Sequence, residues 1–194
     1  MTIFGISGSM ALMLVGFGLR DSIMDIARRQ YQELQHYTGT IIDDEDATDK
    51  ERQELDEFLK NDSQIERYTH VQFTKMSVPR NKSNISVYVY VPENLETFNK
   101  DVTLQDRKTK EKYKLTEAGT VISEKTATLT GLKVGDTMTI TKDGKNYETK
   151  IAAVTENYMG HYLYLTPACY EKIYGEKPEY NCFLFTIRDG YSQK

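Results

Sequence analysis

The sequence predicts an α+β protein in which a long N-terminal helix leads into a domain of short helices and strands. The first observation is that residues 1–19 contain no charged side chain. The second is that an amphipathic helical pattern follows at once and lasts to about residue 38. The third is that the rest of the chain alternates strand patterns with short capped helices, as mixed domains do.

Composition limits the classes of partner. The 194 residues carry a formal net charge of −4, and the pI is about 5.5. Proteins that bind nucleic acid usually have a basic face, so we expect no nucleic-acid partner. The two cysteines, Cys169 and Cys182, do not define a disulfide scaffold. A single bridge between them is one interpretation, but two free and partly buried thiols are favoured.

The uncharged segment Met1–Leu19 has three interpretations. A signal peptide is disfavoured, because no positively charged region precedes the apolar run and no A-x-A site follows it. A buried helix of a soluble core is less favoured, because the run is apolar on all faces. A helix of this length extends about 28 Å, close to the thickness of the hydrocarbon layer of a bilayer. We therefore predict that residues 1–19 are a membrane helix or its outer part.

The pattern changes at Arg20, but nothing there predicts the end of a helix. An apolar stripe continues along one helical face, interrupted by Gln30; its members are Leu19, Ile23, Ile26, Leu34 and Tyr37. Residues 20–38 are therefore predicted to extend the membrane helix into water as a stalk. Gly39 is a typical C-terminal signal and predicts the end of the stalk there.

A β-α-β unit is predicted over residues 40–78. Its strands are Thr40–Ile42 and a segment around Val71–Lys75. Thr48 and Glu51 form a T-x-x-E capping box at the start of the helix between them, which runs to about Asn61. The residues expected on one face of that helix are Leu55, Phe58 and Leu59.

The acidic run Asp43–Asp46 precedes that helix. Clustered carboxylates can bind a hard cation, but the run lacks the glycine and the bidentate glutamate of an EF-hand loop. A solvated loop is the favoured interpretation, since negative charge is stabilised near a helix N-terminus.

The stretch from residue 81 to residue 179 is rich in predicted strands. They are Ile85–Val91, Val102–Asp106, Tyr113–Leu115, Thr120–Ile122, Thr137–Thr141, Tyr147–Val154 and Tyr162–Leu165. Short helices are predicted after Asn94, Ser123 and Thr166. Ser123 is expected to cap the second of these helices, and Thr166 to cap the third, with Pro167 at its first position. Asp143-Gly144 predicts a two-residue hairpin turn. A last strand, Cys182–Ile187, precedes a polar tail.

No residue of the chain is predicted to be catalytic, to bind a cofactor or to bind a metal. No Walker A motif or G-x-S-x-G elbow is present, and His36, His70 and His161 are far apart in the sequence. We therefore expect a protein that is not an enzyme. The aromatic stretch Tyr158–Tyr164 is either an exposed contact surface or the packed entry to a strand, and the second is favoured.

Three stretches together resemble the FtsX/MacB-like permeases of ABC transporters, in particular the long permeases of Gram-positive bacteria. The matching stretches are Met1–Tyr37, Val121–Asp136 with its V-G-D turn, and Val154–Tyr164 with Pro167, Tyr170 and Gly175. The first is the most specific, above all at Gly5–Gly8 and Leu14–Ile23. The resemblance covers most of the chain and is patchy between about residues 40 and 115.

The resemblance implies an extracytoplasmic domain at the cell membrane, extracellular in a Gram-positive bacterium. Residues 39–80 and 180–194 would form a porter-like β-α-β part whose second half is missing, and residues 81–179 an inserted β-rich lobe. It also implies a separate cytoplasmic ATPase as partner. The implied function is to couple ATP hydrolysis to export, or to work on an extracytoplasmic substrate or partner.

Two other functional classes stay open. A ligand-sensing extracellular domain of a membrane receptor would carry a similar anchored helix. A secreted hydrolase would need a convergent acid/base set, which the sequence does not offer. In a soluble preparation residues 1–19 have no lipid to face, and we expect them to pack against a second copy or a crystal neighbour.

Overall fold

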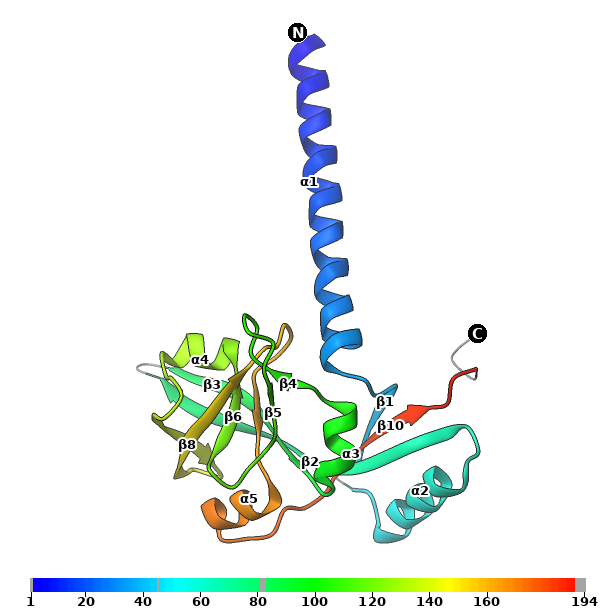
Figure 1. The fold of residues 1–194 in the computed structure, drawn as a ribbon, viewed down its shortest axis with the longest axis vertical. Coiled ribbons are helices and arrows are strands. Elements are labelled where there is room, and N and C mark those ends of the chain that lie inside the picture. The colour runs from blue at the N-terminus through cyan, green and yellow to red at the C-terminus, as the bar shows by residue number, and fades with distance from the viewer. Residues whose placement is uncertain (1, 45, 81–82, 191–194) are drawn as a thin grey trace.

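The computed structural model describes residues 2–44, 46–80 and 83–190, and in the N-terminal helix it describes side chains at residue 8 and from residue 10 onward. Met1, Glu45 of the acidic run and the last four residues of the predicted tail lie outside the described residues. Figure 1 shows a long helix that stands on a mixed domain of strands and short helices. The α+β class is therefore confirmed.

The long helix is α1 (Thr2–Arg28), which continues as a π-helix, η1 (Arg29–Leu34). The predicted stalk was too long, because the helix ends at Leu34 and not near Gly39. Its predicted stripe is covered only at the lower end: Leu34 is buried, whereas Leu19 is 61% exposed and Ile23 is 56% exposed. Among the residues whose side chains are described, no helix has both the length and the apolar character needed to cross a membrane.

The remaining elements match the predicted order. The strands are β1 (Gly39–Ile42), β2 (Ile65–Arg80), β3 (Ser83–Pro92), β4 (Leu104–Gln105), β5 (Lys112–Tyr113), β6 (Thr120–Ser123), β7 (Thr137–Lys142), β8 (Lys145–Thr155), β9 (Tyr162–Tyr164) and β10 (Cys182–Ile187). The helices are α2 (Asp49–Asn61), α3 (Leu95–Asp101), α4 (Glu124–Thr130) and α5 (Pro167–Tyr174).

The predicted β-α-β unit is present as β1, α2 and β2, but its two strands do not touch. The main sheet has the order β1-β10-β2-β3-β9-β6-β8-β7, so β10 lies between β1 and β2 and is antiparallel to both. This is a split β-α-β arrangement. The last predicted strand therefore completes the unit formed by the first two.

The far end of the sheet curls back on itself. β7 pairs with β2 at Ser77 and Thr141, so β2, β3, β9, β6, β8 and β7 form a closed ring of six strands. The ring can close because β2 is 16 residues long, far longer than the predicted segment around Val71–Lys75. Its first part, up to Val71, pairs with β10, and its second part, from Val71 to Arg80, pairs with β3, so one strand joins the split unit to the ring.

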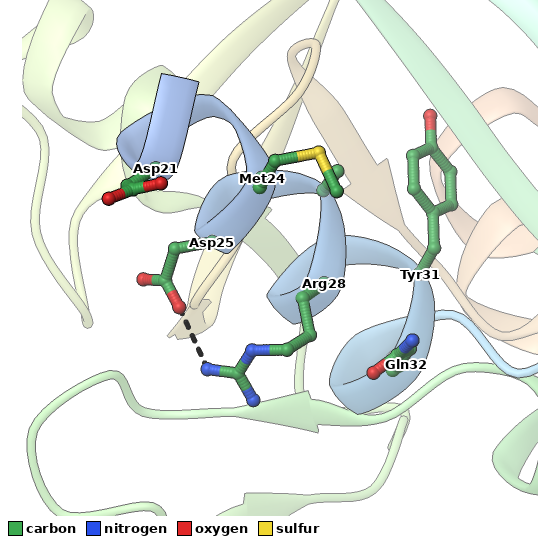
Figure 2. A pocket seen from close by; sticks show the side chains of 7 residues that line it. Asp21, Met24, Asp25, Arg28, Tyr31 and Gln32 are labelled. Atoms are coloured by element: carbon green, nitrogen blue, oxygen red, sulfur yellow. Dashed lines mark hydrogen bonds and ion pairs between the residues drawn. The ribbon is translucent and has the colours of Figure 1, made fainter. Parts of the chain in front are cut away.

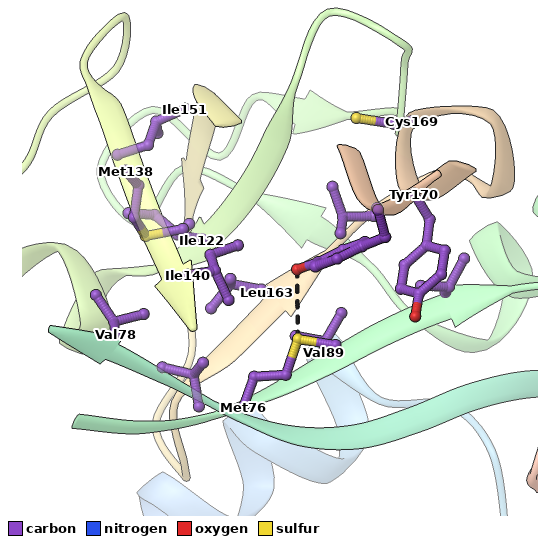
Figure 3. Packing of buried hydrophobic residues seen from close by; sticks show 14 residues of the cluster. Met76, Val78, Val89, Ile122, Met138, Ile140, Ile151, Leu163, Cys169 and Tyr170 are labelled. Atoms are coloured by element: carbon purple, nitrogen blue, oxygen red, sulfur yellow. Dashed lines mark hydrogen bonds between the residues drawn. The ribbon is translucent and has the colours of Figure 1, made fainter. Parts of the chain in front are cut away.

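Aliphatic side chains fill the ring, and α5 closes one side of it (Figure 3). Ile122, Ile140 and Leu163 are completely buried there. Tyr170 and Tyr174 of α5 cover them, and the Tyr174 hydroxyl lies 3.3 Å from the sulfur of Met76. The ring and α5 thus form one compact core.

Several local predictions are confirmed and two are wrong. The Thr48–Glu51 capping box is present, as are Pro167 and the Thr166 cap of α5. Phe58 was expected on the buried face of α2 with Leu59, but its side chain is 58% exposed. Ser123 precedes α4 but makes no side-chain cap. Its hydroxyl bonds to that of Thr126 at 2.9 Å and accepts the Tyr162 N–H at 3.2 Å.

Both cysteines, which lie in the described part of the chain, are buried and free. Cys169 is on α5 and Cys182 begins β10, the element types predicted for them. The prediction of two buried thiols is therefore confirmed.

Candidate functional site

The foot of the long helix, residues 29–36, is where the helix meets the domain. The Gln35 N–H donates to the Gln30 carbonyl five residues earlier, at 2.9 Å, which is the hydrogen-bond spacing of a π-helix. Gln30 is 1% exposed and Leu34 is also buried. Arg29 to Leu34 thus change the helix from a free rod to a packed element, and π-helical turns of this kind frequently mark functional sites.

Gln30 makes the first of two connections between the foot and the domain. Its Nε2 donates to Asn157 Oδ1 at 3.0 Å, and its Oε1 accepts the backbone N–H of Tyr158 at 2.9 Å. Both ends of the amide are therefore bonded to the loop that follows β8. A buried amide needs such partners, since a lost hydrogen bond in the interior costs about 1–3 kcal/mol.

Hydrogen bonds of Asn157 and Glu156 fix the conformation of the loop that binds Gln30. The Asn157 amide donates to the carbonyl of Met159 at 2.5 Å. Glu156, 3% exposed, accepts from Gln105 Nε2 at 2.8 Å, Lys110 Nζ at 2.6 Å and the Tyr158 hydroxyl at 2.5 Å. Burial raises the pKa of Glu156, but these hydrogen bonds outweigh it and hold the pKa below its ordinary value.

The second connection is made by the backbone and lies at α3. The Leu34 carbonyl accepts the Thr103 N–H at 2.8 Å, and the His36 N–H donates to the Asp101 carbonyl at 2.7 Å. The Asp101 carboxylate is completely buried and accepts from Arg67 Nε of β2 at 2.6 Å. Burial raises the pKa of Asp101, and the ion pair with Arg67 opposes that effect only in part.

Above the foot, the outward face of α1 is charged and open. Asp25 accepts from Arg28 at 2.8 Å and from Arg29 at 2.7 Å, and these bonds hold the pKa of Asp25 below its ordinary value. Figure 2 shows this face, a shallow groove of about 520 Å³ whose lining side chains, including Met24 and Tyr31, all belong to the helix and its foot. Ion pairs so exposed contribute little stability.

The arrangement is suited to holding a helix rather than to chemistry. In the described ranges, no group of three or more His, Cys, Asp or Glu side chains is placed to hold a metal ion. The foot brings together one amide, backbone groups and a salt-bridged loop, none of which is an activated nucleophile. What this geometry can do is fix the direction of α1 relative to the ring.

The histidines singled out in the sequence are not brought together. His36 lies at the foot, where its Nε2 is 3.0 Å from the Thr103 hydroxyl, and His161 is partly buried beside β9. His70 is on β2 between two carboxylates. The aromatic stretch Tyr158–Tyr164 was predicted to be either an exposed contact surface or the packed entry to a strand, and it contains both. Tyr164 is buried in the core, whereas the sulfur of Met159, which is 46% exposed, lies 3.3 Å from the Tyr31 hydroxyl.

Sequence reasoning missed Gln30, Glu156 and Asn157. Gln30 was treated as an interruption of an apolar stripe. A polar residue at the centre of such a stripe is a signal for a buried hydrogen bond, but its partners are 127 and 128 residues away in the sequence. Nothing in the local pattern around Asn157 identifies it as the acceptor.

Comparison with known proteins gives likenesses in structure only. No protein-family model matches the chain, and no curated protein matches it in sequence. Among solved structures, it is similar to the periplasmic region of MacB from Actinobacillus actinomycetemcomitans, with a TM-score of 0.47 and 12% identity over 81% of this chain and 77% of that one. It is also similar to the extracellular domain of the noncanonic ABC-type transporter YknZ from Gram-positive bacteria, with a TM-score of 0.45 and 11% identity over 81% and 84%.

Proposed function

We propose that this chain is an extracytoplasmic domain of an ABC-transporter permease, held at the membrane by residues 1–19 and moved through α1. The observation that carries the proposal is a contrast within one continuous helix. Apolar side chains such as Leu12 and Leu14 are exposed in the upper part, and the foot at Gln30 is buried in the domain. An exposed apolar helix of this kind needs a cover, and lipid is the cover that the sequence resemblance implies.

The foot supplies the coupling. A continuous helix moves as a rigid body, and its lower end is bonded both to the loop after β8 and to the segment after α3. A tilt of α1 therefore has to carry the ring with it or break buried hydrogen bonds. The motion would come from a separate cytoplasmic ATPase, and this domain would pass it to an extracytoplasmic substrate or partner without doing chemistry itself.

A ligand-sensing domain of a membrane receptor is the second candidate, because a rigid helix can also carry a signal inward. The sequence of the complete gene separates the two. Several further membrane helices and a neighbouring ATPase gene favour the permease, whereas a kinase or methyl-accepting module favours the receptor.

The test is a proline in α1, made in the full-length protein together with its ATPase in lipid nanodiscs. Ile26→Pro removes a helix hydrogen bond and kinks the rod at a cost of about 3 kcal/mol. Ile26→Ala at the same exposed position is the matched control. We expect Ile26→Pro to keep ATP hydrolysis but to abolish the ATP-dependent movement of a fluorophore on α4 relative to the membrane. Unchanged movement in a folded Ile26→Pro protein would overturn the proposal.

A further inference from the structure

The hairpin of β4 and β5 carries a run of basic side chains. Residues 106–114 contain five Lys or Arg and two Asp or Glu, so their net charge is +3. The whole chain has a formal net charge of −4, so the remaining residues together carry −7. Residues 107–112 are all exposed. The segment 106–114, called the basic hairpin below, is therefore a positive surface on an acidic protein.

The turn of the basic hairpin has a defined shape. Asp106 Oδ1 accepts the backbone N–H groups of Lys108 at 2.7 Å and of Thr109 at 2.8 Å. The Lys110 N–H donates to the Asp106 carbonyl at 3.0 Å, and Lys110 itself has a φ of 59°, in the left-handed region. Side-chain bonds of this kind from Asp to the following backbone are typical of tight turns. A partner therefore does not have to order the turn before it binds.

Two cations of the basic hairpin attach it to the rest of the domain. Lys110 Nζ donates to the buried carboxylate of Glu156 at 2.6 Å. Arg107 Nε donates to Glu124 of α4 at 2.6 Å, and the Arg107 guanidinium lies 4.6 Å from the centre of the Tyr158 ring. Glu156 and Tyr158 belong to the loop that binds the foot of α1. The basic hairpin is therefore fixed to the same loop as the helix.

The other cations of the basic hairpin are not neutralised by the domain. Among the described residues, no ion pair involves Lys108, Lys112 or Lys114. Burial lowers the pKa of His36 at the foot, and the positive charge of Lys112 lowers that pKa further. Lys112 therefore lies near the foot of α1 with its charge uncompensated.

The basic hairpin lies on the side of the domain that faces the apolar part of α1. Figure 1 shows the turn between β4 and β5 at the end of the domain from which α1 rises. Between Leu19, the last residue of the uncharged segment, and Tyr31 at the foot, the helix rises by about 18 Å. The head-group layer of a bilayer takes up about 5–7 Å of that length. A turn at the level of Tyr31 thus faces the lipid surface across about 10–13 Å, little more than the Debye length of about 8–10 Å.

We propose that the basic hairpin docks on the anionic head groups of the bilayer that holds residues 1–19, an inference that rests on the membrane attachment proposed above. Lysine binds phosphate as a point charge, and anionic lipid surfaces attract clusters of basic side chains. Two or three free lysines bind a soluble polyanion weakly. The anchor, however, keeps them beside the lipid surface at a high effective concentration.

Docking has a mechanical consequence for α1. The basic hairpin lies to one side of the helix (Figure 1) and is bonded to the loop that binds the foot. Attraction to the lipid surface on that side therefore tilts the helix and the domain together. The docked hairpin sets the resting tilt of α1, and a movement of the helix has to release it.

The experiment measures how closely the domain approaches the lipid surface. The full chain carries a donor fluorophore at Thr128→Cys, an exposed position of α4, and the vesicles carry an acceptor on their head groups. Both native thiols are buried. We expect the donor to lie about 5–10 Å closer to the acceptors in vesicles that contain phosphatidylglycerol than in pure phosphatidylcholine, because the charges close most of the gap estimated above. At about 1 M salt the Debye length falls to about 3 Å, and the approach should disappear.

Paired variants test whether the lysines of the hairpin are responsible. Lys108→Gln combined with Lys112→Gln should remove most of the approach, because it removes two free charges at the turn. Lys60→Gln combined with Lys177→Gln is the matched control. These two exposed residues lie on α2 and just after α5, at the end of the domain away from the N-terminus of α1 (Figure 1), and their replacement should leave the approach unchanged. Circular dichroism checks the fold, and the salt dependence of the wild type decides the matter if the first double variant is unfolded.

Three results would overturn the proposal: equal distances in both kinds of vesicle, an approach that persists at 1 M salt, or equal losses in the two double variants. Soluble polyphosphate, added to phosphatidylcholine vesicles, separates a lipid surface from a free polyanion. If polyphosphate binds through Lys108 and Lys112 but phosphatidylglycerol causes no approach, the hairpin recognises a soluble polyanion and the lipid assignment is wrong.

Flotation with phosphatidylcholine vesicles tests the anchor separately, because these vesicles carry no net charge for the basic hairpin to bind. A chain that does not float with them contradicts the proposed function and this inference with it. A chain that floats, but does not approach the anionic surface, contradicts this inference alone.

Discussion

Apolar side chains are usually buried and polar ones exposed, but the two halves of the N-terminal helix show the opposite. In the upper half Leu12 is 76% exposed, whereas at the foot the polar Gln30 is 1% exposed. Burial at the foot is possible because the Gln30 amide has two partners with good geometry in the loop after β8. The apolar side chains of the upper half are exposed in this structure, and in the function proposed above lipid covers them. The contrast separates a part proposed for the membrane from a part that is bonded to the domain.

The largest expected effect concerns the upper half. The full chain should float with phosphatidylglycerol vesicles in a density gradient. Leu12→Glu combined with Val15→Glu places two charges in the apolar segment at about 2.5–3.5 kcal/mol each, and should abolish flotation. Met24→Glu, equally exposed but outside the apolar segment, should not. If the double variant still floats, the upper half is not the membrane anchor.

The next largest effect is the loss of unfolding free energy when a leucine is replaced by alanine, compared between the ring and the upper helix. Leu163→Ala in the ring should lower the free energy of unfolding by about 2–5 kcal/mol, because it leaves a cavity in a closely packed core. Leu14→Ala in the upper helix should change it by less than about 0.5 kcal/mol in detergent. Urea unfolding followed by circular dichroism measures both. Similar losses would mean that the upper helix packs on the domain in solution.

A smaller effect tests the attachment at the foot. Gln30→Leu leaves Asn157 Oδ1 and the Tyr158 N–H without their partner, and should cost about 1–3 kcal/mol of unfolding free energy. Gln32→Leu, on the exposed side of the same turn, is the matched control. A Gln30→Leu protein as stable as the control would show that the buried amide is not what holds the helix.

The smallest effect is a pH dependence of the loop behind the foot. The folded pKa of Glu156 is lowered from its ordinary value of 4.5, so the unfolded chain binds this proton first as the pH falls. The stabilisation is complete above about 4.5 and is lost as the pH drops through the folded pKa. Asp101, with a raised pKa, acts in the opposite direction. The difference between wild type and Glu156→Gln should therefore shrink below that range, and a constant difference would contradict it.

Local signals predicted most of the elements, because caps, hairpin turns and alternation act over a few residues. The capping box at Thr48 and the Asp143-Gly144 turn are examples, and both are found as predicted. What could not be predicted depends on contacts distant in sequence. The closure of the ring at Ser77 and Thr141, the π-helix at Arg29 and the burial of Gln30 all depend on partners far along the chain.

The misplaced Phe58 has the same origin. Its position on α2 fits a helical stripe, yet only Leu59 of that helix is fully buried against the sheet. A stripe predicts which residues share a face, but not how much of that face the rest of the fold covers.

The rigid attachment of α1 to the ring is tested most directly by the distance between them in vesicles, measured by double electron–electron resonance. Spin labels at Ser22→Cys and Lys125→Cys report on α1 and α4. The native thiols are buried, and burial raises the pKa of Cys182 to about 12, so they resist labelling. If the foot is rigid, the distances form a single distribution as narrow as that of the control pair Lys125→Cys and Lys172→Cys within the domain. A broad distribution between α1 and α4 would contradict it, because the foot would then be a loose joint and could not transmit motion.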